Sequence, residues 1–167
     1  MRKAWLHLRD VLLAPPDHRL FQRSLFAGAI SVCGALASLF LALGVLALAG
    51  VAPDELESVD PGSGWRLFFG AVVIAPVVES LLLGGTLWLM PERWSIPARA
   101  LVAGIGWGLL HGLFAPFWFF GTWFPFFVFA CGWMTWRQRS FRHALAAAAL
   151  PHAVQNLLAC CIVAVSG

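Results

Sequence analysis

Long runs of apolar residues alternate with short polar segments along the whole chain. The first run extends from Ser24 to Ala52, and four more cover about 66–90, 98–115, 117–136 and 143–165. A helix rises about 1.5 Å per residue, so roughly 20 apolar residues cross a hydrocarbon core about 30 Å thick. The pattern therefore predicts an all-α membrane protein with about five transmembrane helices.

The third and fourth of these helices are separated by a turn and not by a charged loop. No charged residue occurs from Ala100 to Trp136. A single helix over that stretch would measure about 56 Å, nearly twice the hydrocarbon thickness. Pro116 and Gly121 mark the predicted turn.

The same pattern divides the chain into three parts of one domain. Residues 1–23 mix basic and apolar side chains and break at Pro15 and Pro16, which is typical of a short helix on the cytoplasmic membrane surface. Residues 24–52 form the predicted first transmembrane helix. Residues 66–165 form a predicted core of four transmembrane helices.

Composition and cysteine placement narrow the class of protein. The chain is 60% hydrophobic and only 11% charged, so lipid is the expected solvent. The basic residues lie in short clusters and form no continuous patch, so no nucleic-acid partner is expected. All four cysteines fall in apolar runs, which indicates neither a disulfide framework nor a cysteine metal site.

The distribution of basic residues predicts the orientation. Ten of the eleven Lys and Arg residues fall on one side of a five-helix arrangement, and the acidic segment from Asp54 to Asp60 falls on the other. Basic loops favour the cytoplasm, so we expect the N-terminus inside and the C-terminus outside. The compact architecture suggests a bacterial inner membrane.

Four polar residues interrupt the predicted spans near their middles: Glu79, His111, His152 and Asn156. An ionisable group at the bilayer centre costs at least about 2.5 to 3.5 kcal/mol, so it is normally paired, faces a cavity or has a function. His152 and Asn156 are four residues apart and share a helix face. We expect all four side chains to meet inside the bundle, although a single His or Asn can also serve as an interhelical hydrogen bond.

Three short motifs contain these residues: Pro76 to Gly84, Trp107 to His111, and His152 to Asn156. In order and spacing they resemble the motifs EExxxR, FxxxH and HxxxN of the CAAX-processing and bacteriocin-processing intramembrane protease family, also called the Abi family. The resemblance covers Arg66 to Val165 and implies the four-helix core of that family.

The first motif departs from the family pattern at two positions. Ser80 stands where the pattern has a second Glu, and Gly84 stands where it has Arg. Two such residues four apart on a helix suit an ion pair. If both the Glu and the Arg are absent, no buried charge lacks a partner. If only one of them were absent, the other would be a buried charge without a partner. Ser80 and Gly84 themselves are expected to form a contact of small residues between helices.

The resemblance implies an intramembrane endopeptidase that hydrolyses a peptide bond in a membrane-associated protein or peptide. Glu79 would be the general base that activates water, and His111 would help to orient or deprotonate that water. His152 and Asn156 would donate hydrogen bonds to the developing oxyanion. No cofactor is implied.

Several alternatives remain open. Glu79, His111 and His152 could form a catalytic zinc site, although no HExxH pair supports it. The chain could also be an inactive family member that binds a peptide as an immunity-like or scaffolding protein, or a small transporter or proton-relay subunit. The oligomeric state is not predicted.

Overall fold

The computed structural model describes residues 9–51 and 64–166, apart from the side chains at positions 66, 163 and 166. Within these ranges the chain consists of helices joined by turns, without a β-strand. The all-α prediction is therefore confirmed for this part of the chain. Residues 1–8 of the predicted surface segment and the acidic positions 54–60 lie outside the described residues.

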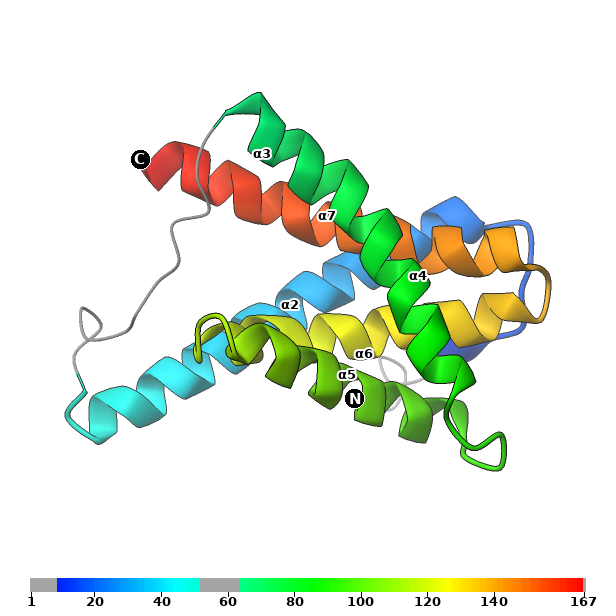
Figure 1. Ribbon diagram of the computed structural model, residues 1–167, viewed down its shortest axis with the longest axis horizontal. Helices are drawn as coiled ribbons and strands as arrows, with labels where there is room; N and C mark the ends of the chain where they lie inside the picture. Colours follow the sequence, from blue (N-terminus) through cyan, green and yellow to red (C-terminus); the bar gives the residue numbers. More distant parts are fainter. Residues whose placement is uncertain (1–8, 52–63, 167) are drawn as a thin grey trace.

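The helices follow closely the five apolar runs of the sequence (Figure 1). After a helical stretch at residues 9–13 they are α2 (Leu20–Leu48), α3 (Trp65–Phe69), the π-helix η2 (Gly70–Ile74), α4 (Ala75–Trp88), α5 (Ile96–Gly112), α6 (Trp118–Arg137) and α7 (Phe141–Ser166). The elements α3, η2 and α4 continue into one another and form one long rod.

Three stretches among the described residues are long and apolar enough to cross a membrane. They are Leu20–Leu48, Leu67–Trp88 and Phe141–Ile162. Large apolar side chains on the outside of the bundle, such as Phe40 at 69% exposure and Leu41 at 71%, are left largely uncovered by the described residues. These features are those of a membrane protein, because lipid can solvate such a surface and water cannot.

The first long helix begins four residues before the predicted Ser24, because Arg23 is accommodated inside it. Arg23 is only 8% exposed. Its guanidinium donates hydrogen bonds of 2.8 to 3.2 Å to the carbonyl oxygens of Val11, Ala14 and Pro15. The predicted start of this helix, after Arg23, is therefore too late. The preceding segment folds back and supplies hydrogen-bond acceptors to the Arg23 side chain.

The described part of the N-terminal segment packs against the ends of α2 and α6. The hydroxyl of Thr135 donates to the carbonyl of Leu12 at 2.9 Å, and the guanidinium of Arg23 lies 5.0 Å from the ring centre of Trp136. These contacts fix the segment onto the bundle. Whether it also lies on the membrane surface stays a prediction.

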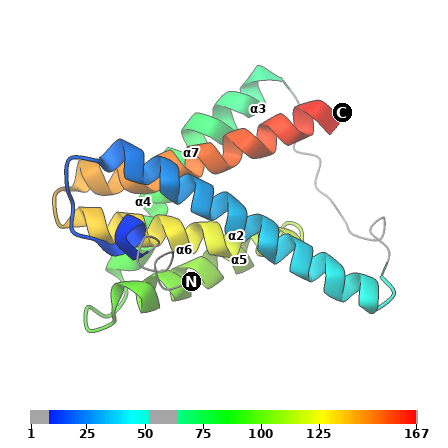
Figure 2. The same cartoon turned by 180° about the vertical axis from the view of Figure 1, so that it is seen from behind.

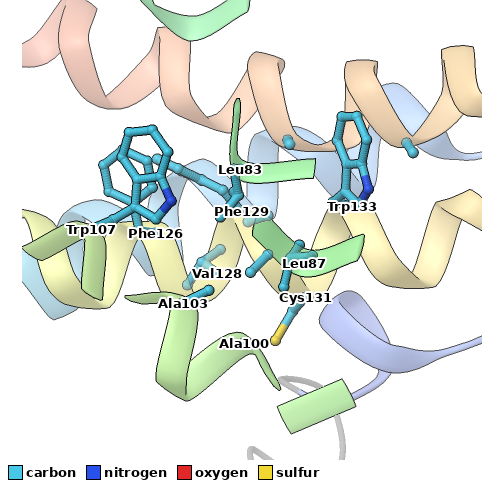
Figure 3. Packing of buried hydrophobic residues seen from close by; sticks show 14 residues of the cluster. Leu83, Leu87, Ala100, Ala103, Trp107, Phe126, Val128, Phe129, Cys131 and Trp133 are labelled. Atoms are coloured by element: carbon cyan, nitrogen blue, oxygen red, sulfur yellow. The ribbon is translucent and has the colours of Figure 1, made fainter. Parts of the chain in front are cut away.

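The core lies where α4, α5 and α6 meet (Figure 3). Its large buried side chains are Leu83 and Leu87 of α4, Trp107 of α5, and Phe126, Val128, Phe129 and Trp133 of α6.

Small residues bring α5 and α6 into close contact. A Cβ atom added at Gly104 would lie 2.6 Å from the carbonyl oxygen of Trp123, and one added at Gly108 would lie 2.6 Å from the Cβ of Trp123. Side chains larger than hydrogen would therefore push the two helices apart.

The remaining helices form a structure that opens toward one end (Figures 1 and 2). The first half of α2 packs on α7, where the hydroxyl of Ser31 donates to Oε1 of Gln155 at 2.9 Å. Farther along, α2 stays with α6, and the indole of Trp123 donates to the hydroxyl of Ser38 at 2.9 Å. The second half of α7 instead follows η2 and α3.

The close approach of α5 to α6 generates a stability prediction. Gly104→Ala should lower the free energy of unfolding by about 1 to 3 kcal/mol, because the new methyl group meets backbone atoms of α6. Gly106→Ala on the same helix is the matched control, since nothing lies within 4 Å of its added Cβ. Unfolding in detergent measures both, and equal stabilities of the two variants would contradict the prediction.

Candidate active site

A cavity of about 600 Å³ is lined by residues of all the long helices, from α2 to α7. Its lining includes the four polar residues that interrupt the spans in the sequence: Glu79, His111, His152 and Asn156. Most of the remaining wall is apolar and includes Leu39, Phe117, Phe126, Phe129 and Ala159. The expected meeting of the four side chains is therefore observed, while their chemical roles stay predictions.

Glu79 lies between the two histidines. Its Oε2 is 3.7 Å from Nε2 of His111 and 3.9 Å from Nε2 of His152. The carboxyl side chain is 25% exposed, yet Oε2 itself is buried without a hydrogen-bond partner among the described residues. One carboxylate oxygen thus faces two imidazoles across gaps slightly longer than a direct hydrogen bond.

The last turn of α5 orients His111. Its Nδ1 lies 2.8 Å from the carbonyl oxygen of Trp107, one turn earlier in the helix. A carbonyl only accepts, so Nδ1 carries the proton and Nε2 is the atom that faces Glu79. The ring also contacts Phe126, with 5.2 Å between ring centres. This contact and the hydrogen bond together set the direction of the imidazole.

His152 is held by ring packing. Its side chain is 6% exposed and stacks on Phe129 of α6, with ring centres 4.7 Å apart and planes 17° apart. Nδ1 is buried and has no hydrogen-bond partner among the described residues. The tautomer that keeps the proton on Nε2 directs the only N–H toward Glu79 and the cavity.

Asn156 supports the rod that carries Glu79. In η2 the backbone N–H of Ala75 bonds to the carbonyl of Gly70, five residues back. With the same spacing, the carbonyl of Ala71 would accept from the backbone N–H of residue 76. That residue is Pro76, which has no N–H. Nδ2 of Asn156 donates to that carbonyl at 2.8 Å. Asn156 therefore has a structural role besides its predicted role as an oxyanion donor.

The two departures from the family pattern lie in the core. Ser80 is 1% exposed, and its hydroxyl has no partner among the described residues. A Cβ added at Gly84 would lie only 2.1 Å from Cζ2 of Trp133. The indole of Trp133 thus lies against the α-carbon of Gly84, and a larger residue there would have to displace the ring.

Sequence reasoning missed two polar side chains of the cavity, Thr122 and Gln155. Gln155 lies within the third motif and inside a predicted span, so its polarity was the available signal. The sequence did not show that Pro76 leaves the Ala71 carbonyl without a backbone donor, because a π-helix has no clear sequence pattern.

The zinc alternative on Glu79, His111 and His152 stays a prediction. Among the described residues, no group of three or more His, Cys, Asp or Glu side chains is arranged closely enough to hold a metal ion. The distances from Oε2 to the two Nε2 atoms by themselves do not select between a metal ion and a water molecule.

Comparison of the chain with protein-family models, curated proteins and solved structures finds no match. The resemblance to the Abi family therefore rests on the three motifs.

The hydrogen bond between Asn156 and Ala71 generates a prediction that needs no assay of activity. Asn156→Leu should lower the free energy of unfolding by about 1 to 3 kcal/mol, because a part-buried carbonyl in the cavity wall loses its donor. Pro76→Ala supplies a backbone N–H in the position where the proline has none. Asn156→Leu should therefore cost clearly less in the Pro76→Ala background, as a double-mutant cycle in detergent measures. The same cost in both backgrounds would show that the two residues act independently.

Proposed function

We propose that the protein is an intramembrane endopeptidase that hydrolyses a peptide bond in a membrane-associated protein or peptide. The observation that carries this proposal is the approach of one oxygen of Glu79 to Nε2 of both His111 and His152 within a largely apolar cavity. The order of the three motifs, which resembles that of the Abi family, gives independent support.

The proposed topology has five transmembrane helices. Besides the three long apolar stretches, α5 has 17 residues and α6 has 20, which correspond to about 26 Å and 30 Å of helix. Both lengths suffice for the hydrocarbon core when the ends lie in the interface. With the basic loops inside, the N-terminus is cytoplasmic, the C-terminus is outside, and the membrane is a bacterial inner membrane.

Glu79 and His111 are suited to hold the attacking water. With the His111 proton on Nδ1, Oε2 and Nε2 are two acceptors that face each other across 3.7 Å. A water molecule can donate one hydrogen to each of them at about 2.8 Å and keep a lone pair for attack on a carbonyl carbon. Glu79 then takes the proton as general base, and a buried carboxylate with no other partner is well suited to accept it.

His152 is suited to stabilise the developing oxyanion. Its rigid stacking on Phe129 fixes the direction of the Nε2 proton before the reaction begins, and such preorganised donors contribute most when water is excluded. The second hydrogen of the Asn156 amide remains for the same purpose, because one hydrogen serves the Ala71 carbonyl.

The walls of the cavity favour an apolar substrate segment. Glu79 is the only Lys, Arg, Asp or Glu residue among the described lining residues. A peptide with charged side chains would lose their hydration without finding partners. The proposed substrate is therefore an uncharged, extended stretch next to or within a transmembrane segment.

Replacement of the proposed base provides the central test. Glu79→Gln should lower the cleavage rate at least about 10²-fold, because the amide cannot accept the proton from water. The purified protein would be reconstituted with inner-membrane proteins in liposomes, and mass spectrometry would detect the released peptides. Glu92→Gln, which changes an exposed carboxyl in the turn between α4 and α5, is the control. Wild-type rates in Glu79→Gln would refute the proposal.

The same assay separates the water mechanism from the zinc alternative. Cleavage that survives a strong chelator supports direct activation of water by Glu79. Cleavage that is lost with chelator and recovered only with added zinc supports the metal site.

A non-catalytic peptide-binding protein is the second candidate, and the packing of Trp133 on Gly84 favours it. The first motif here has no second carboxylate and no Arg to support the site, and the space beside Gly84 is filled by a ring. A cell whose phenotype is fully restored by the Glu79→Gln variant would indicate binding and not hydrolysis.

The proposed orientation generates a separate prediction. Alkaline phosphatase fused to the C-terminus should be active, because it folds only outside the cytoplasm, and green fluorescent protein fused to the N-terminus should fluoresce. If green fluorescent protein also fluoresced when fused to the C-terminus, both ends would lie in the cytoplasm. The number of spans would then be even, which would contradict the proposed five.

A further inference from the structure

A second pocket lies farther along α4 and α6 than the cavity that contains Glu79. It has a volume of about 190 Å³ and lies between the end of α4, the beginning of α5 and the end of α6. Its lining residues are Gly84, Leu87, Trp88, Arg99, Trp133, Met134 and Arg137. No role assigned to the catalytic cavity involves the two arginines.

One guanidinium is fixed at the wall of this pocket. A terminal amino group of Arg99 donates to the carbonyl of Leu87 in the last turn of α4, which also accepts from the backbone N–H of Met90. Nε of Arg99 is buried and has no partner among the described residues. A buried N–H of a charged group normally has a hydrogen-bond acceptor, so a ligand in the pocket could supply the acceptor that the Nε–H of Arg99 lacks.

The second guanidinium, of Arg137, adds a like charge to the same pocket. Arg137 is exposed and lies 6.0 Å from the ring centre of Phe141. No acidic side chain lines the pocket, and neither arginine is in an ion pair within the described ranges. Two guanidinium groups without a carboxylate make the pocket suitable for an anion.

The surroundings indicate the depth of the pocket in the membrane. Trp88, which is 79% exposed, lies beside the guanidinium groups, and the buried ring of Trp133 also lines the pocket. Indole rings concentrate at the level of the lipid headgroups. Arginine binds phosphate oxygens in a bidentate manner.

We propose that this pocket binds the phosphate group of an anionic phospholipid, with Arg99 and Arg137 as its ligands. The phosphate accepts hydrogen bonds from the guanidinium groups, and the acyl chains extend along the apolar surface of the bundle. Basic pockets between transmembrane helices bind anionic headgroups in this way. The bound lipid would join the ends of α4, α5 and α6 and would not depend on any hydrolytic activity.

The test compares lipids and variants by native mass spectrometry of the purified full-length protein in an uncharged detergent. Phosphatidylglycerol should bind more tightly than phosphatidylcholine, whose headgroup has no net charge. Arg137→Gln should weaken phosphatidylglycerol binding roughly fivefold, the effect of one basic residue near an anionic surface. Arg137→Lys should weaken binding less than Arg137→Gln, because it keeps the positive charge and loses only the bidentate geometry of the guanidinium.

Arg142→Gln is the matched control, because it removes an exposed arginine near the same end of the bundle that does not line the pocket. Equal weakening by Arg142→Gln and Arg137→Gln would overturn the proposal and indicate general attraction to a basic surface. Equal affinity for the two lipids would also overturn it. The melting temperature of the protein is measured as well, with phosphatidylglycerol and with inorganic phosphate. If phosphate alone raised it as much as the lipid, and only when Arg137 is present, the ligand would be soluble phosphate and the lipid assignment would be wrong.

Discussion

The geometry of the site depends on one hydrogen bond, from the amide of Asn156 to the carbonyl of Ala71. A backbone carbonyl within a membrane bundle that lacks its helical donor must find another protein group or a water molecule. The π-helix and Pro76 leave that carbonyl without its regular partner, and α7 supplies one. The bond joins the rod that carries Glu79 to the helix that carries His152, so the same interaction that satisfies the backbone also aligns the two side chains. π-Helical turns often occur at functional sites for this kind of reason.

The second constraint is the burial of a carboxyl group among aromatic rings. Glu79 has two imidazoles near one oxygen. His111 is held by the carbonyl of Trp107 one turn earlier in its own helix, and His152 is held by the face of Phe129 on α6. The three polar groups therefore cannot easily turn away from one another. This preorganisation is useful for hydrolysis, because the donors and acceptors do not have to reorganise when charge develops. It would equally suit a site that recognises a peptide carbonyl without cleaving it.

The sequence predicted the fold class and the meeting of the polar residues, because lipid imposes two simple rules. A spanning segment must be long and apolar, and a polar residue within it must face the interior. Details that depend on tertiary contacts were not predictable. Arg23 lies inside α2 because a segment earlier in the chain folds back onto it. The π-helix and the bond to Asn156 depend on the relative position of two helices 85 residues apart in sequence, and no local pattern contains that information.

The altered first motif can be understood from the same packing. A buried ion pair stabilises a fold only if its attraction offsets the free energy of removing both charges from water. Apolar side chains that fill the same space often give a protein of equal stability. In this chain Trp133 lies against Gly84, and Leu83 beside it is completely buried. The helix that carries Glu79 is thus held on both sides of the site: after Glu79 by the ring of Trp133 against Gly84, and before Glu79 by the hydrogen bond from Asn156 to Ala71. This packing leaves the carboxyl of Glu79 between the two imidazoles, so the chain can hold the geometry of the site without the second Glu and the Arg of the family pattern.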